Sequence, residues 1–119
     1  MTTHLWRAML VWLLTAFFAF GGLTNIFATS AIQAEYSHWG YPDGFHYVTG
    51  TLELATAALV VFPRTRLAGT ALGILVMAAA VTTLVIHQEH THALMPLATM
   101  AFLVLNGYAV LRARRVVSQ

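Results

Sequence analysis

Four long apolar segments constrain the fold of this chain more than any other feature of the sequence. They run from about residue 5 to 29, 45 to 62, 67 to 86 and 94 to 111. Each is long enough to cross a membrane, because a spanning helix needs about 20 residues, with a usual range of roughly 17–25. Apolar residues make up 59% of the chain and charged residues 8%, which leaves too little polar surface for a soluble domain. The sequence therefore predicts an all-α integral membrane four-helix bundle, a single transmembrane domain over residues 1–119.

The first apolar segment also has features of a secretory signal peptide. Arg7 could serve as its basic region, and Ala28-Thr29-Ser30 has the small residues of a cleavage site. The apolar core of a signal peptide is only about 7–15 residues long, and this segment is much longer. We therefore expect it to remain in the protein as a helix.

The arginines predict how the helices are oriented. The chain has no Lys, and its six basic residues are Arg7, Arg64, Arg66, Arg112, Arg114 and Arg115. Four crossings place all of them on one side, which the positive-inside rule makes cytoplasmic. Both termini are thus predicted to be cytoplasmic in the cell (inner) membrane, with the His-rich loops on the outer side. Basic residues beside apolar segments are typical of topology anchors, so nucleic acid is not an expected partner.

A single carboxyl group interrupts the second apolar segment. Glu53 follows His46 by seven positions, so the two share one face of a helix, with Thr49 and Gly50 between them. At about 1.5 Å per residue, Glu53 lies roughly 10 Å below His46, near the middle of the bilayer. An ionised carboxylate there costs at least about 2.5 kcal/mol, so Glu53 is expected to face the bundle, find partners or stay protonated. It could exchange protons, or it could be a structural hydrogen bond between helices.

Asn25, near the outer end of the first segment, is a candidate hydrogen-bond partner for Glu53. Thr82 and Thr83 of the third segment are further candidates, and each of these residues could instead make an ordinary interhelical bond. A buried acid can exchange protons and an imidazole can relay them. We therefore take Glu53, His46 and Asn25 as the candidate catalytic residues.

Histidines gather at the predicted outer face. The third segment ends in IHQEHTH, where His87 and His90 share a face if the helix continues. Together with His38 they are candidate ligands for iron, copper or zinc. The spacing matches neither His-Glu-x-x-His nor a zinc-finger pattern. The alternative is a solvated loop whose histidines titrate near neutral pH.

Aromatic residues crowd the region before and at the start of the second apolar segment. They are Tyr36, Trp39, Tyr41, Phe45 and Tyr47. A loop that lies on the lipid head groups would explain them. The alternative is a lid over a lipophilic pocket that is entered from the outer leaflet, and for this reason Trp39 and Tyr47 are the candidate cofactor-binding residues.

Two stretches of the sequence contain short motifs that follow one another in an order typical of one protein family. The first is FFAFGGLTNI, and the second is WGYPDGFHYVTGTLELATAALVVFPRTR, which contains Gly50-Thr-Leu-Glu53-Leu54 and the Pro63-Arg64 loop. A Gly/Ala-rich segment that ends in His and a last apolar segment follow. Taken together, these features resemble the DoxX-like family of small membrane proteins. The resemblance implies a four-helix membrane fold linked to sulfur and quinone redox chemistry or to oxidoreductase complexes, and it implies a functional Glu53.

Three classes of function fit these residues. The first is a small membrane oxidoreductase acting on a lipophilic substrate or quinone, in which a metal or quinone carries the redox chemistry because the chain has no Cys. A non-redox isomerase or cyclase with Glu53 as general acid fits the same site. The second class is a non-catalytic accessory subunit that meets a partner subunit through its helices. The G-x-x-x-G spacing of Gly69 and Gly73 predicts a close helix contact, which could serve such an interface, a second copy or the bundle itself. The third is proton-coupled transport, which would need several chains to enclose a pathway.

Overall fold

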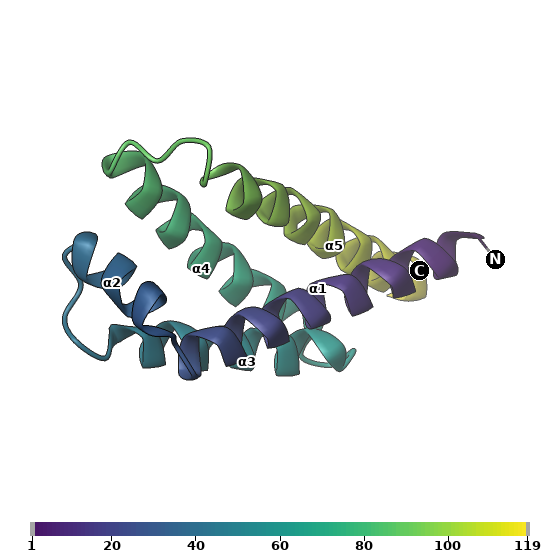
Figure 1. Ribbon diagram of the computed structural model, residues 1–119. Helices are drawn as coiled ribbons and strands as arrows, with labels where there is room; N and C mark the ends of the chain where they lie inside the picture. Colours follow the sequence, from purple (N-terminus) through teal and green to yellow (C-terminus); the bar gives the residue numbers. More distant parts are fainter. Residues whose placement is uncertain (1, 119) are drawn as a thin grey trace.

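The computed structural model describes residues 2–118, with side chains described between residues 5 and 115. Within this part of the chain the backbone forms helices and no strand. The helices are α1 (Thr2–Ile26), α2 (Ser30–His38), α3 (Phe45–Val61), α4 (Arg66–Ile86) and α5 (Leu94–Ser118) (Figure 1). The all-helical prediction is confirmed, and α2 is a short additional helix that the predicted set of four did not include.

The additional helix α2 lies where the sequence predicted only a connection. Its N-cap is Thr29, whose side-chain oxygen accepts a hydrogen bond from the backbone N–H of Ile32 at 3.3 Å, as helix starts require. Correspondingly, α1 ends at Ile26 and does not reach residue 29 as predicted. After α2, Gly40 and Gly44 adopt φ angles of 84° and 82°. Glycine takes these angles without steric cost, and the chain turns back into α3.

The remaining helix ends lie close to the predicted ones. At the α3–α4 turn, the Arg66 side chain donates Nε–H to Val60 O at 2.8 Å and Nη2–H to Val61 O at 3.0 Å. These bonds satisfy carbonyl groups that the end of a helix leaves without partners. The last helix, α5, continues to Ser118, beyond the predicted end at 111. Its arginines explain the extension, because Arg has a high helix propensity and a cation is stabilised at the C-terminus of a helix.

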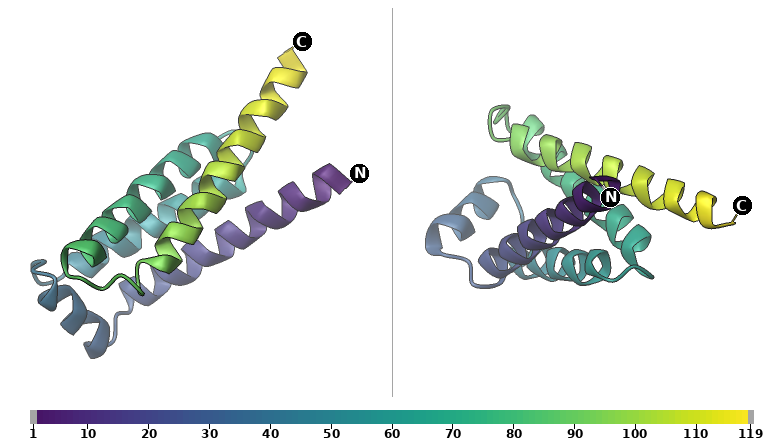
Figure 2. Two further views of the ribbon diagram at one scale, coloured as in Figure 1. Left: turned by 90° about the horizontal axis from the view of Figure 1, so that it is seen from above. Right: turned by 90° about the vertical axis from the view of Figure 1, so that its right-hand side faces the viewer.

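The four long helices run up and down along the molecule, which measures 50 × 25 × 21 Å (Figure 1). In this bundle α1 contacts α3, α3 contacts α4 and α4 contacts α5, with a smaller contact between α1 and α5. The start of α1, the α3–α4 turn and the end of α5 lie together at one end, which we call the arginine end because these regions contain all the arginines of the chain (Figure 2). The opposite end, with α2 and the α4–α5 connection, is called the aromatic end. Which side of a membrane each end faces stays a prediction.

The helices of the bundle have the length and composition of membrane spans. Three stretches qualify: Leu5–Ile26, Arg66–Ile86 and Leu94–Arg115. The fourth long helix, α3, is apolar but has 17 residues, or about 26 Å at 1.5 Å per residue, against a hydrocarbon core of about 30 Å. The chain is therefore an integral membrane protein with three helices able to span the bilayer, and a fourth crossing by α3 stays a prediction.

The G-x-x-x-G spacing of α4 is used inside the bundle. A Cβ atom at Gly69 would lie 2.7 Å from Leu59 Cβ and 2.7 Å from Val60 N of α3. At Gly73 a Cβ atom would lie 3.1 Å from side chains of both α3 and α5. Both glycines are buried, so they form a close contact between helices of one chain. The predicted close helix contact is thus present inside the bundle, and association with a second chain stays a prediction.

Gly69→Ala is expected to destabilise the protein by about 1–3 kcal/mol, because the new methyl group meets backbone atoms of α3 and overpacking costs this much. Gly107→Ala is the matched control. Its Cβ would meet Thr70 Cγ2 at 3.4 Å, and Ala is favoured over Gly in a helix by about 1 kcal/mol. Thermal unfolding in the same detergent compares the two variants with the wild type. A Gly69→Ala variant as stable as the wild type would contradict the close contact.

Candidate functional site

A cavity of about 250 Å³ lies at the aromatic end, between α1, α2, α3 and α4. We call it the Glu53 cavity. Its walls are mostly apolar and aromatic, and its polar groups come from Asn25, Tyr36, Trp39, Tyr41, Thr49, Glu53 and Thr83. An apolar pocket in which a few polar groups converge is the usual form of a small-molecule site.

Glu53 and Asn25 meet at this cavity. Glu53 is only 8% exposed, and Asn25 Nδ2–H donates a long hydrogen bond of 3.4 Å to Glu53 Oε2. The same amide nitrogen donates to Gly21 O at 2.9 Å, and Asn25 Oδ1 accepts from the Tyr36 hydroxyl at 2.6 Å. These bonds hold the Asn25 amide in one orientation between the carboxyl and the phenol. The predicted contact between Asn25 and Glu53 is present, and a catalytic role for either residue stays a prediction.

Glycines allow α1 and α3 to approach closely at this point. A Cβ atom at Gly21 would lie 2.5 Å from Glu53 Oε2, so the missing side chain provides the space that the carboxyl group occupies. A Cβ atom at Gly50 would lie 2.9 Å from Gly22 O. Small residues are what bring the backbones of membrane helices together. The position of Glu53 against α1 therefore depends on these glycines.

His46 lies on the same face of α3 as Glu53, as the seven-residue spacing predicts. It is 5% exposed, and its Nδ1 is 2.6 Å from Asn25 O. A carbonyl oxygen only accepts hydrogen bonds, so this contact requires the proton on Nδ1. The ring is therefore bonded to the backbone of Asn25, whose side chain reaches Glu53. His46 is not among the residues that line the cavity, and its catalytic role stays a prediction.

Aromatic residues from α2 and the following connection cover the cavity. The Tyr36 ring has its centroid 5.5 Å from that of Trp39 and 5.9 Å from that of Tyr41. Tyr41 stacks on Phe45, with 4.4 Å between the centroids. Burial raises the pKa of the Tyr36 hydroxyl above its ordinary value of 10.0, so this group is a neutral donor. We call these four residues the aromatic lid, and their position favours the lid interpretation over a loop on the head groups.

Two hydrogen bonds connect the aromatic lid to α4 and the turn after it. The Tyr41 hydroxyl lies 2.5 Å from Thr83 Oγ1. Trp39 Nε1–H donates to Glu89 Oε2 at 2.7 Å. Trp39, a predicted cofactor-binding residue, thus lines the cavity and also donates a hydrogen bond to the turn after α4.

Tyr47, the other predicted cofactor-binding residue, is not part of the cavity lining. Its side chain is 55% exposed, and its ring lies beside the His46 ring with 4.2 Å between the centroids. Successive residues of a helix are rotated by about 100°, so the neighbour of a buried His46 points outwards. The prediction placed Tyr47 with the other aromatic residues without allowing for this rotation.

The predicted metal ligands do not come together as a set. His38 and His87 are adjacent, with 5.8 Å between the ring centroids. Within the described residues, however, no group of three or more His, Asp or Glu side chains has the geometry to hold a metal ion. The physical reason is local: α4 ends at Ile86 and Gln88 has a φ of 59°, so the helix does not continue. His87 and His90 consequently lose the shared face on which the prediction depended.

Three residues of the site were not predicted as site residues. Tyr36 bonds Asn25, Thr49 lines the cavity and Gly21 makes room for the carboxyl group. The sequence carries a signal for Thr49, which lies on the stripe between His46 and Glu53. For Tyr36 the only signal is its place among the clustered aromatic residues, because its bond to Asn25 depends on α2 folding back over the end of α1.

A bundle of apolar helices around a cavity with one buried carboxyl group defines the class of this chain, a small integral membrane protein with an internal cavity. The sequence model of the DoxX-like family matches residues 9–106, a range that includes every residue lining the Glu53 cavity. The chain belongs to the DoxX-like family, and the resemblance seen in the sequence is confirmed. The comparisons found no match among curated proteins and none among solved structures.

Acid is expected to loosen the aromatic lid. The hydrogen bond from Trp39, with a further contribution from His92, lowers the pKa of Glu89 below its ordinary value of 4.5. A carboxyl whose pKa is lowered by folding adds stability above its unfolded pKa and loses it as the pH falls through the folded value. The contribution is therefore complete above pH 4.5 and disappears below it. Trp39 fluorescence, measured in a Trp6→Phe/Trp12→Phe background, should change in that acidic range.

The matched control for this acid effect is Glu89→Gln, which cannot titrate. Its Trp39 fluorescence should be unchanged over the same pH range. An identical acid transition in Glu89→Gln and in the parent would show that another group is responsible.

Proposed function

We propose that this protein is the membrane-embedded binding and proton-transfer part of an oxidoreductase that acts on a lipophilic ring compound of the quinone class. The observation that carries the proposal is the buried Glu53 carboxyl at the wall of an aromatic-lined cavity of about 250 Å³. Glu53 is the proton-exchanging residue in this proposal. Asn25 and Tyr36 are positioning residues, because they hold the carboxyl and each other by hydrogen bonds.

The size and lining of the cavity favour a single ring. Small-molecule pockets are typically about 300–1,000 Å³, so this cavity suits a ring system whose apolar tail extends outside it. The rings of Trp39, Tyr36 and Tyr41 offer faces and edges to a flat aromatic group, and such pairs contribute about 0.5–1.5 kcal/mol beyond area burial. Lipid is the natural source of such a compound, since the helices around the cavity are those of a membrane protein.

The proton chemistry matches a carboxyl group. Reduction of a quinone to a quinol takes two electrons and adds one proton to each of the two ring oxygens. A carboxyl group within reach of one oxygen can donate that proton, or accept it in the reverse direction. The two electrons would come from a partner redox protein or a bound cofactor, because a chain without Cys has no thiol or iron–sulfur couple of its own. The role assigned to the chain is thus to bind the ring and to move a proton at Glu53.

Two other functions remain distinguishable from this one. An isomerase or cyclase with Glu53 as general acid would use the same cavity but would not prefer a quinone. An accessory subunit would not need the cavity, and its predicted docking residues Gly69 and Gly73 are occupied within the bundle. Association with a partner subunit or a second copy stays a prediction.

Glu53→Gln is expected to weaken binding of a short-chain ubiquinone analogue by roughly 2–10-fold, because the hydrogen bond from a neutral carboxyl to a quinone oxygen contributes about 0.5–1.5 kcal/mol. Binding is measured by quenching of tryptophan fluorescence in the protein reconstituted in lipid nanodiscs. Glu35→Gln is the matched control, since Glu35 is exposed on α2.

A Glu53→Gln variant that binds the quinone analogue as tightly as Glu35→Gln does would overturn the proposal. If neither the wild type nor the controls bind the analogue, while a cellular phenotype still depends on Glu53, the isomerase or cyclase reading is favoured instead.

We further propose that the arginine end is cytoplasmic and that the aromatic end faces the outside of the inner membrane. The charge asymmetry supports this orientation, because all arginines lie at one end and the positive-inside rule applies to them. The chain has no Cys, so single cysteines can report it. Ser37→Cys in α2 should react with a membrane-impermeant maleimide in intact cells, and Pro63→Cys in the α3–α4 turn should react only after the membrane is opened. The reverse pattern would contradict the orientation.

A further inference from the structure

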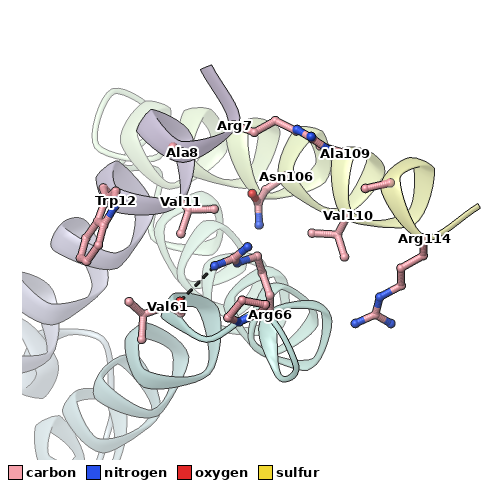
Figure 3. Close-up of a pocket in the computed structure, with 12 residues that line it drawn as sticks. Arg7, Ala8, Val11, Trp12, Val61, Arg66, Asn106, Ala109, Val110 and Arg114 are labelled. Atoms are coloured by element: carbon pink, nitrogen blue, oxygen red, sulfur yellow. Dashed lines mark hydrogen bonds between the residues drawn. The ribbon is translucent and has the colours of Figure 1, made fainter. Parts of the chain in front are cut away.

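A second and larger cavity, of about 640 Å³, lies at the arginine end. Arginines from three helices line it: Arg7 of α1, Arg66 of α4 and Arg114 of α5 (Figure 3). Trp12 and Asn106 also line it, and the remaining walls are apolar. We call it the arginine cavity. Its chemistry differs from that of the Glu53 cavity, because it offers cations and an amide and no group that exchanges a proton near neutral pH.

No acidic side chain lines the arginine cavity. The four acidic residues of the chain are Glu35, Asp43, Glu53 and Glu89. They lie in α2, in the connection after it, in the middle of α3 and in the turn after α4, and so away from the arginine end. Positive groups gathered beside an apolar wall are costly unless an anion accompanies them. The charged groups in the cavity lining are all cations, which favours an anionic ligand.

Arg66 is the best-placed group to hold such an anion. Its Nε–H and one Nη2–H are fixed by the carbonyls of Val60 and Val61, which holds the guanidinium rigid. A guanidinium group has five donors, so these two bonds leave donors for a ligand. Figure 3 shows this guanidinium between the end of α3 and Asn106, with Arg7 and Arg114 toward the margin of the cavity. Guanidinium groups bind phosphate oxygens in pairs of parallel hydrogen bonds.

The apolar walls indicate where the phosphate comes from. Val11, Val61 and Val110 line the cavity, and Trp12, which also lines it, is 64% exposed on the surface of α1. A soluble phosphate has no apolar surface to bury against these walls, whereas a lipid acyl chain does. We propose that the arginine cavity binds an anionic phospholipid, with its phosphate against Arg66, Arg7 and Arg114 and its acyl chain along α1. This proposal is independent of what occupies the Glu53 cavity.

The test uses the whole purified protein in a mild detergent. Phosphatidylglycerol or zwitterionic phosphatidylcholine is added, and native mass spectrometry measures the lipid that each protein retains. The wild type should retain phosphatidylglycerol in preference to phosphatidylcholine. The Arg7→Gln/Arg114→Gln double variant should bind phosphatidylglycerol roughly thirtyfold more weakly. The reason is that each of the two lost cations contributes a similar favourable free energy to the binding of an anionic lipid. Arg66 is left intact, since it also caps α3.

Two controls keep the outcome decisive. Arg64→Gln removes a positive charge from the same end of the molecule, but Arg64 does not line the cavity, so this variant should bind phosphatidylglycerol as the wild type does. Glycerol phosphate, which has the phosphate without acyl chains, should not displace the lipid.

Three outcomes would each overturn the proposal. They are equal retention of both lipids, an equal loss of lipid binding in Arg64→Gln, and unchanged lipid binding in the double variant. Displacement by glycerol phosphate would assign the cavity to a soluble phosphate instead. Arg114→Gln alone, an exposed position in α5, gives the same comparison if the double variant does not fold.

Discussion

The close contact between α1 and α3 is the interaction on which the rest of the site depends. Gly21, Gly22 and Gly50 let the two backbones approach, and the space above Gly21 holds the Glu53 carboxyl. Without that space the carboxyl could not sit beside Asn25, and a buried acid without partners is costly in a membrane. The same contact brings the end of α1 near enough for Asn25 to bond both His46 and Tyr36. Helix packing and site geometry are therefore set by the same glycines.

Much of this structure could be predicted from local sequence properties. Apolar length predicts the long helices, and a seven-residue spacing predicts that His46 and Glu53 share a buried face. What could not be predicted depends on contacts between distant segments or on one turn. The contact of Tyr36 with Asn25 needs α2 to fold over α1, and α2 is too short and too polar to give a periodic pattern. The loss of the shared face of His87 and His90 could not be predicted either, because the turn at Gln88 ends the helix before it can continue.

The two ends of the bundle have different chemistry, and this division suggests different tasks. The aromatic end joins a carboxyl, a phenol and an amide under flat rings, and in our proposal it binds a small lipophilic molecule and exchanges a proton with it. The arginine end joins three guanidinium groups with an apolar wall and has no acidic side chain in its cavity. In our proposal this end binds an anionic lipid and faces the cytoplasm, as the positive-inside rule predicts. The range matched by the DoxX-like family, residues 9–106, includes the residues that line the Glu53 cavity. The part of α5 after residue 106 lies beyond that range.

The central claim is that Glu53 faces a cavity that a lipophilic molecule can enter. Labelling with dicyclohexylcarbodiimide, a lipophilic reagent that modifies protonated carboxyl groups, tests it most directly when the modified residue is identified by peptide mass spectrometry. We expect modification at Glu53 in preference to Glu35, Asp43 and Glu89, and protection of Glu53 when a quinone analogue is bound. No modification of Glu53, or modification that the bound analogue does not reduce, would contradict the claim.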